Sequence, residues 1–326
     1  MKAPKLPTSP SRVWPGGFAL QNPSSTSSIA VAGGTVLAGG EELYLLRQGA
    51  TKFATRELPK GMGDAIAVAV DPRCRGRMII AGLFDLAILE GDGITIAKGK
   101  NTDSEFSEFA WGPGTGKRGS ELYIAKDDGT VLRHSPGARG FDELDLPSVR
   151  AIATDNAGLL AYVSVDEEDD WGIDVCAHTA SGLIVTHNVE APTLLWDVHL
   201  ARMGDALAVG FGGEKVWLTR RLTEPKMMCV EALSGGPLAF EGPDAASALF
   251  GVSIGETVTS LMRVDASGVA TSIGEFGVPE AEKGITRVHQ LAWDATRKTL
   301  WAAVGKAGVL SSTAPGAPVP GAATLS

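Results

Sequence analysis

The sequence predicts an all-β protein built from seven similar units of about forty residues each. Three observations support this fold class. Glycine supplies 41 of the 326 residues while aromatic residues supply only 6%, a composition that favours short strands and tight turns. A pair of short apolar strands recurs along the chain, separated by a turn with Gly or Asp. No long helical pattern lies between the strands, which excludes a parallel sheet built from strand-helix-strand units.

The repeated pair of strands is clearest in two places, at residues 65–71 with 78–82 and at residues 290–294 with 300–305. Five further copies complete the set: 28–32 with 35–39, 109–112 with 122–125, 151–155 with 159–163, 194–198 with 207–210, and 237–240 with 248–251. Self-similarity at this period is the signature of a repeat architecture, in which each unit buries its apolar faces against its neighbours.

The spacing of the copies predicts four antiparallel strands in each unit. The first strands begin near residues 27, 64, 105, 148, 193, 237 and 286, so that successive units are 37 to 49 residues apart. Gly129 and Gly268 end two of the turns, and similar turns stand at 91–93 and 156–158. These residue types tolerate the positive φ that tight turns between strands require.

With these units the chain resembles the β-propeller repeat families, in the loose manner of WD-repeat, YVTN-type and NHL-type proteins, over essentially its whole length. No unit has the Gly-His and Trp-Asp pairs of WD repeats or the full Asp-box of sialidases. The resemblance implies a seven-bladed β-propeller, with four-stranded antiparallel blades packed around a central channel. It implies no particular activity.

The two ends of the chain are expected to meet in one blade. The last unit lacks a fourth strand, and residues 12–20 are apolar enough to supply it. Such pairing would remove an exposed sheet edge. The prediction is therefore one propeller domain over residues 11–313, with flexible tails at 1–10 and 314–326. The alternative is a six-bladed ring in which one weak unit, 237–281 or the first, is not a blade.

Charge and cysteine content narrow the partners and the compartment. The formal net charge is −9, which argues against nucleic acid as a partner, because phosphate backbones need clustered Lys and Arg. Three widely spaced cysteines, without a CxxC pair, indicate neither a disulfide framework nor a zinc site. The chain shows no signal peptide and no apolar run long enough for a membrane span. We expect a cytoplasmic protein without membrane contact and without a cofactor.

The candidate binding site is the set of turns between the second and third strands, which a propeller places on the same face as the loops that join the blades. Twelve carboxylates and two lysines fall in these turns, so the face should attract a basic protein. The longest acidic run ends in Trp171, a residue type enriched at binding hot spots. The predicted partner-binding residues are Glu41, Asp127, Asp128, Asp166, Glu167, Glu168, Asp169, Asp170, Trp171, Glu214 and Glu256. The alternatives are that the acids are ordinary soluble turn residues and that Trp171 packs between blades.

A second candidate site is the central channel. Polar residues on or near the innermost strands could point into it: Glu108, Arg150, Asp197, His199, His289 and Gln290. They could hold an ion or a small molecule, although a propeller channel is expected to be polar and wet in any case.

Two sequence motifs are interpreted as structural. The Gly251–Gly255 match to G-x-S-x-G is followed by a strand instead of the required helix. Residues 112–117 are one residue short of a phosphate-binding loop. A non-enzymatic protein-binding platform is therefore favoured. The alternative is a propeller-type metal-dependent hydrolase or lactonase, or a lyase, acting at the channel mouth.

Overall fold

The fold is all-β, as the sequence predicts, and the described residues contain no helix. The structure is a computed structural model. It describes residues 18–22, 26–74, 76–82, 85–90, 93–97, 106–112, 119–138, 140–146, 148–154, 159–165, 171–179, 182–190, 198–203, 206–211, 215–223, 226–242, 245–255, 258–277, 288–305 and 308–313. The predicted tails at 1–10 and 314–326 lie outside these residues.

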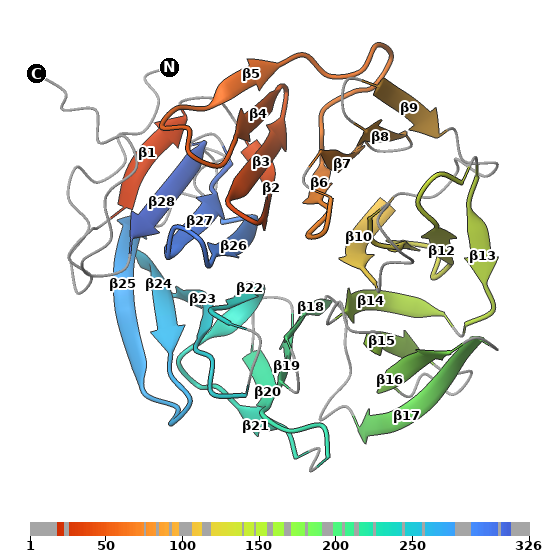
Figure 1. Cartoon of the computed structure of the whole chain (residues 1–326). Coiled ribbons are helices and arrows are strands. Elements are labelled where there is room, and N and C mark those ends of the chain that lie inside the picture. The colour runs from red at the N-terminus through yellow and green to blue at the C-terminus, as the bar shows by residue number, and fades with distance from the viewer. Residues whose placement is uncertain are drawn as a thin grey trace, which may run out of the picture.

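The described strands form seven four-stranded sheets in which every neighbouring pair is antiparallel, and the sheets follow one another around a central axis (Figure 1). Sheet 1 contains β2 (Thr26–Ala32), β3 (Thr35–Gly40), β4 (Leu43–Leu46) and β5 (Ala54–Arg56). Sheet 2 contains β6 (Ala67–Val70), β7 (Arg77–Ala81), β8 (Leu86–Glu90) and β9 (Gly93–Ala97). Sheet 3 contains β10 (Phe106–Trp111), β11 (Leu122–Lys126), β12 (Val131–His134) and β13 (Asp142–Leu144).

The remaining sheets repeat the same order. Sheet 4 contains β14 (Val149–Thr154), β15 (Leu159–Val165), β16 (Trp171–Thr179) and β17 (Gly182–Glu190). Sheet 5 contains β18 (Val198–Met203), β19 (Ala206–Phe211), β20 (Lys215–Thr219) and β21 (Met228–Cys229). Sheet 6 contains β22 (Ser234–Phe240), β23 (Leu249–Ile254), β24 (Val258–Val264) and β25 (Ala270–Gly277). Sheet 7 contains β26 (Gln290–Asp294), β27 (Thr299–Ala303), β28 (Val309–Thr313) and β1 (Phe18–Asn22).

The two ends of the described chain share sheet 7. Strand β1 pairs antiparallel with β28, with Phe18 opposite Ser312 and Leu20 opposite Leu310. It is the outermost strand of that sheet, in the order β1-β28-β27-β26. The sequence places this fourth strand at 12–20, and the strand found begins at Phe18 and extends to Asn22.

One predicted strand overlaps the described chain only at its last residue. The sequence puts the first strand of the fifth unit at 194–198, and residues 191–197 lie outside the described part of the chain. The described strand β18 covers Val198–Met203. It pairs with β19 from Val198 opposite Phe211 to Met203 opposite Ala206, so the strand extends beyond the predicted end.

Burial is greatest in the second strands and lowest in the outermost strands, while the first strands β2, β6 and β26 are partly exposed. The second strands are packed on both faces by neighbouring sheets, so β3, β7 and β27 are buried throughout and read as continuous apolar runs. The outermost strands β5 and β13 are mostly exposed. The core is divided into clusters between neighbouring sheets; one of them joins Ile29 of sheet 1 to Trp301 of sheet 7.

Neighbouring sheets are also joined by arginines, which we call the guanidinium latches: Arg77, Arg220 and Arg297. In each latch the guanidinium bonds to two places in the next sheet. One place is the connection between the first and second strands of that sheet. The other is the end of the third strand of that sheet, or the connection that follows it. Arg297 donates to the carbonyl oxygens of Gly34 and, at 2.9 Å, Arg47. Arg220 donates to Ser247 at 2.5 Å and to Asp265 at 3.0 Å.

The Arg77 latch is the most buried of the three. Arg77 is 1% exposed and donates to Ser120 O at 2.5 Å in sheet 3. Its Nη2 donates to His134 Nδ1 at 2.8 Å. Its counter-ion Asp71, fully buried, also accepts from the Ser120 N–H at 2.8 Å and from the Ser120 hydroxyl at 2.9 Å. A buried ion pair of this kind stabilises only as a complete set, because either partner alone is a desolvated charge.

We expect Arg77→Met to lower the free energy of unfolding by about 3 kcal/mol or more, because it leaves Asp71 buried without its counter-ion. The matched control is Arg133→Met, which breaks the more exposed pair between Arg133 and Asp142 and should cost at most about 1 kcal/mol. Urea unfolding of both variants measures the difference. Equal costs would contradict the role given to the latch.

His134 should make the joint between sheets 2 and 3 sensitive to acid. Burial, and then the nearby Arg77 charge, lower the pKa of His134 from its ordinary value. The neutral ring fits both of its bonds, since Nδ1 accepts from Arg77 and Nε2 donates to Ala138 O at 3.2 Å. The unfolded chain therefore binds a proton more readily than the folded one. Stability should be complete above about pH 6.5 and should fall as the pH decreases below it.

The measurement is the free energy of unfolding as a function of pH, over about two pH units around the ordinary histidine pKa. His134→Gln should flatten the slope, and His187→Gln on the outer strand β17 should leave it unchanged. The same slope in wild type and His134→Gln would rule this explanation out.

Candidate functional site: the central cavity and its mouth

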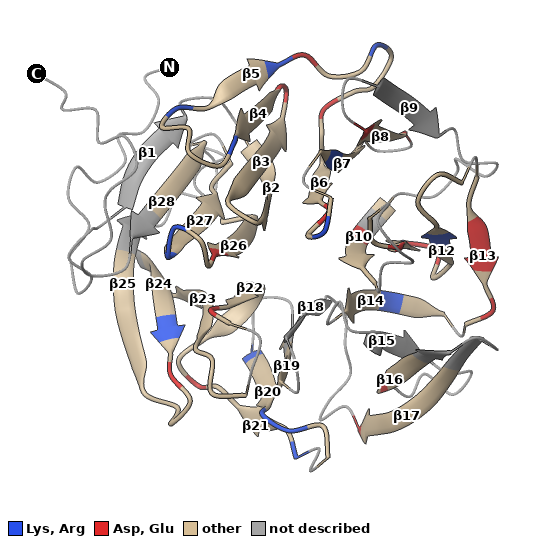
Figure 2. Cartoon of the chain, in the orientation of Figure 1, with Lys and Arg blue, Asp and Glu red and all other residues tan. Residues whose placement is uncertain are grey.

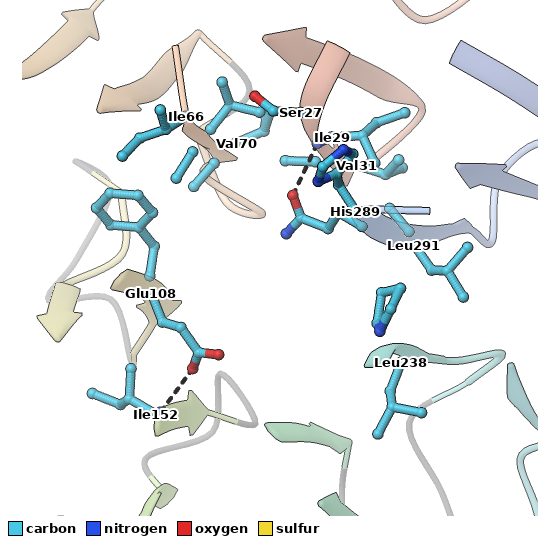
Figure 3. A pocket seen from close by; sticks show the side chains of 18 of the residues that line it. Ser27, Ile29, Val31, Ile66, Val70, Glu108, Ile152, Leu238, His289 and Leu291 are labelled. Carbon is cyan, nitrogen blue, oxygen red and sulfur yellow. Dashed lines mark hydrogen bonds between the residues drawn. The ribbon is translucent and has the colours of Figure 1, made fainter. Parts of the chain in front are cut away.

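A cavity of about 600 Å³ lies on the axis of the ring and is lined by the first strands of six sheets, β2, β6, β10, β14, β22 and β26. Figure 3 shows side chains from these strands around one space. Aliphatic and aromatic residues stand around it, namely Ile29, Val31, Ile66, Val68, Val70, Phe109, Trp111, Ile152, Leu238 and Leu291. Ile29, Val68, Val70, Ile152 and Leu291 are buried between the sheets, and the surface that the cavity exposes is more polar than apolar. Its volume is within the range of small-molecule sites.

The first strand of each sheet has one edge without a partner strand, on the side of the cavity. The backbone N–H groups along that edge need hydrogen-bond acceptors. In three places a side chain of the preceding sheet supplies the acceptor. Gln290 Oε1 accepts from the Ile29 N–H at 2.9 Å, and Ser28 Oγ accepts from the Val68 N–H at 2.8 Å. Glu108 Oε2 accepts from the Ile152 N–H at 3.0 Å. These bonds join the inner strands and make the wall less polar.

We call these three acceptor residues the capping residues, and they stand early in their strands. Gln290 is the first residue of β26, and Ser28 and Glu108 are the third residues of β2 and β10. In β2 and β10 a bulge directly precedes the capping residue, where the register shifts between Thr26 and Ser28 and between Phe106 and Glu108. A bulge of this kind redirects a side chain. The extra residue thus helps to turn the capping group toward the neighbouring strand.

One end of the cavity, which we call the mouth, is polar. The turns that follow the second strands reach this end, and their carbonyl oxygens bond to the N–H groups where the chain enters the first strand of the next sheet. The three bonds run from Thr26 N–H to Gly305 O, from Ala65 N–H to Gly40 O and from Val149 N–H to Gly129 O. At the mouth Arg150 Nη1 donates to Asp127 O at 3.0 Å. Lys126 is buried and pairs with Asp128 at 2.9 Å. His289 and Gln290 complete the polar lining on the side of sheet 7.

Four of the six predicted channel residues line the cavity: Glu108, Arg150, His289 and Gln290. His199 belongs to β18, but its side chain and residue Asp197 lie outside the described residues. The surface that the cavity exposes is more polar than apolar, in agreement with the expectation of a polar channel. Sequence reasoning missed the apolar residues that stand between these polar groups, although the signal was present in the aliphatic residues of the first strands.

The structure describes only part of the predicted partner-binding set. Glu41 lies in the turn between β3 and β4, and Asp127 and Asp128 lie in the turn between β11 and β12; all three are exposed. Trp171 is the first residue of β16 and pairs with Val165, but its side chain is not described. The others lie outside the described residues: Asp166, Glu167, Glu168, Asp169, Asp170, Glu214 and Glu256. Figure 2 shows charges of both signs around the ring, for example on the acidic outermost strand β13 of sheet 3 and on β14 of sheet 4, which carries Arg150.

The structure supports the structural interpretation of the G-x-S-x-G match. Ser253 is half-buried in β23, the second strand of sheet 6, and the chain continues into strand β24. Of the short glycine-rich loop, Gly112 follows β10 and residues 113–117 are not described.

Among the described residues, no three His, Cys, Asp or Glu side chains gather as a metal site would require. The described part of the chain also holds no helix of the length and hydropathy that a membrane span needs.

Comparison with known proteins gives a likeness of fold alone. The sequence matches no protein family and no curated protein. The solved structure of PorZ, a bacterial surface component of the type-IX secretion system of Porphyromonas gingivalis, is similar with a TM-score of 0.60 and 12% identity. The match covers 93% of this chain and 40% of PorZ. A chain in a crystal structure of the mitotic checkpoint complex is similar with a TM-score of 0.65 and 12% identity, over 96% of both chains. The two likenesses are compatible with a β-propeller-like fold.

The capping bond of Glu108 should be separable from its charge. We expect Glu108→Ala to lower the free energy of unfolding by about 1–2 kcal/mol, because the part-buried Ile152 N–H loses its acceptor. Glu108→Gln should recover most of this loss, since the amide oxygen can accept the same bond, as Gln290 does for Ile29. Urea unfolding measures both variants. If they are equally unstable, the charge and not the bond stabilises the fold.

Proposed function

We propose that the chain is a seven-bladed β-propeller, closed by β1 against β28, that serves as a non-enzymatic platform for a basic protein partner. The observation that carries this proposal is the placement of Glu41, Asp127 and Asp128. They are exposed on turns that the backbone bonds of Gly40 and Gly129 tie to the next inner strand. Carboxylates presented by a rigid scaffold attract a basic surface and lose little freedom when it binds.

The proposed partner surface also includes the acidic run 166–170 and Trp171. This run connects β15 to β16, the position that the turns of Glu41 and Asp127 occupy in their own sheets. It would add five carboxylates beside one aromatic anchor. The two similar structures come from multi-protein assemblies, a secretion system and a checkpoint complex, which is consistent with a role in assembly. A cytoplasmic location is part of the same proposal.

The test is capture of partners from the native lysate on the immobilised full chain at low and at high salt. We expect a basic protein to be retained at low salt and released as the salt rises, because screening weakens contacts between exposed charges. Two variants should lose it: Glu41→Gln with Asp127→Asn, and a second one that replaces Asp166, Glu167, Asp169 and Asp170 with their amides.

The matched control is Glu57→Gln with Glu143→Gln, which removes two exposed carboxylates at the outer edges of sheets 1 and 3. It should retain the same partner. Retention by all the variants, or a captured protein that is insensitive to salt, would contradict the proposed binding face.

A further inference from the structure

Strand β17 (Gly182–Glu190) is the outer edge of sheet 4, and it is the longest of the outermost strands that the structure describes. It has nine residues, whereas β5 and β13 have three each and β21 has two. It ends the order β14-β15-β16-β17, and no further described strand pairs with it. Its outer edge therefore presents a row of backbone donors and acceptors that a further strand can bind.

The sequence of β17 gives this edge little protection. Outer strands are commonly protected by short length, by charged side chains or by proline. β5 and β13 are short and carry Arg56, Asp142 and Glu143. β17 contains no Lys, Arg or Pro, and its only carboxylate is Glu190 at the last residue. A bulge at Thr186 bends the strand, but pairing with β16 continues on both sides of it, so the edge remains available.

The side chains of β17 divide the edge into an apolar part and an acidic part. Ile184 and Val185, near the hairpin that joins β16 to β17, are each 52% exposed. As successive residues of a strand they point to opposite faces of the sheet. The outermost strands of the two neighbouring sheets, β13 and β21, are far shorter than β17, which leaves part of both faces in water. Glu190, at the other end of the strand, is exposed.

The charge of the β16–β17 hairpin selects the kind of strand that fits. The two strands contain Asp174 and Glu190 but no Lys or Arg, and Asp174 accepts from Asn188 Nδ2 at 2.8 Å. A second copy of the chain would bring a second Glu190 to the same sheet, and two chains that each carry a net charge of −9 repel each other. A strand with Lys or Arg beside Glu190 and aliphatic side chains beside Ile184 and Val185 is complementary to both parts of the edge.

We propose that β17 binds an extended segment of a basic protein, which adds a fifth, antiparallel strand to sheet 4. Backbone hydrogen bonds to the edge provide the affinity, and side-chain contacts fix the register. The N-terminal part of the segment carries the Lys or Arg that meets Glu190. Its C-terminal part carries the aliphatic residues that meet Ile184 and Val185. The antiparallel orientation is chosen because such pairs are slightly more stable per residue than parallel ones.

This inference goes beyond the proposed function. In Figure 1, β17 lies on the outer side of sheet 4, away from the axis, whereas Glu41, Asp127 and Asp128 lie on turns of sheets 1 and 3. A strand can bind this edge whether or not a protein binds those turns. The two proposals therefore fail separately: replacement of the turn carboxylates tests the first, and blocking of backbone amides in a peptide tests the second.

The experiment is a fluorescence-polarisation titration of the full chain with a labelled probe peptide, Lys-Thr-Thr-Thr-Val-Ile-Thr-amide, at neutral pH and low salt. We expect a dissociation constant between about 10 μM and 1 mM, because a short flexible strand loses conformational freedom when it binds. Two further peptides carry N-methyl groups on alternate residues, one peptide for each edge of the strand.

An added strand uses the amides of one edge only. One methylated peptide should therefore bind about ten-fold or more weakly than the probe, while the other should bind as the probe does. Equal binding of the two methylated peptides, or no binding of the probe, would overturn the proposal. This comparison uses the wild-type protein and does not depend on how a variant folds.

Variants of the chain locate the peptide on β17. Ile184→Thr should weaken probe binding about three-fold or more, whereas Ile254→Thr, at an isoleucine of β23 with a similar exposure of 53%, should leave it unchanged. Glu190→Lys should weaken the probe and strengthen a peptide in which Glu replaces Lys, by about two- to five-fold each. Undiminished probe binding by both Ile184→Thr and Glu190→Lys would place the peptide elsewhere and overturn the assignment.

Pairing of β17 with a second copy of the chain is the competing outcome, and sedimentation equilibrium without peptide tests it. We expect a monomer. A dimer that Ile184→Lys dissociates and that Ile254→Lys leaves intact would show that β17 pairs with itself, and the proposed partner strand would be wrong.

Discussion

The contact on which the ring depends is the one between neighbouring sheets, since each sheet is too small to bury its own faces. Apolar clusters lie between neighbouring sheets, but apolar packing is non-directional and does not by itself fix how one sheet is rotated against the next. Between sheets 2 and 3, 5 and 6, and 7 and 1, a guanidinium latch adds directional bonds. Arg77, Arg220 and Arg297 each bond to two separate points of the next sheet, and a planar guanidinium with several fixed donors makes both bonds only in one relative orientation.

The inner ends of the sheets are fixed by a second set of bonds, those of Ser28, Glu108 and Gln290 to the following inner strand. They satisfy donors that would otherwise face the cavity. In β22 the wall contains Pro237, a residue with no N–H to satisfy. These bonds and Pro237 reduce the number of unpaired strand-edge donors in the cavity wall. The mouth is made of turns that carry charged side chains, among them the exposed Asp127 and the buried Lys126.

The fold could be predicted from the sequence because each unit repeats the same signals. The strand pairs at 65–71 with 78–82 and 290–294 with 300–305 reappear as β6 with β7 and β26 with β27, and Gly129 and Gly268 take the expected positive φ of 87° and 88°. Less of the candidate site could be predicted from the sequence. Glu108 and Gln290 could be assigned to the channel by position, but their bonds to Ile152 and Ile29 depend on which strands become neighbours. The Arg77, Asp71 and His134 contact joins residues from two sheets, and no spacing in the sequence signals it.

Sheet 3 links the stability of the ring to its cavity. It carries Glu108 on β10 and Asp127 after β11, and it is held to sheet 2 by the latch that contains His134. The latches of Arg220 and Arg297 reach the next sheet through backbone carbonyl oxygens, which do not titrate. Only the Arg77 latch, among these three, has in the next sheet a side-chain acceptor, His134, that can gain a proton as the pH falls; burial and the Arg77 charge lower its pKa. Because a protonated ring cannot accept from the guanidinium, acid weakens the joint beside the strand that positions the cavity carboxylate, and it does so before it affects the other two latches.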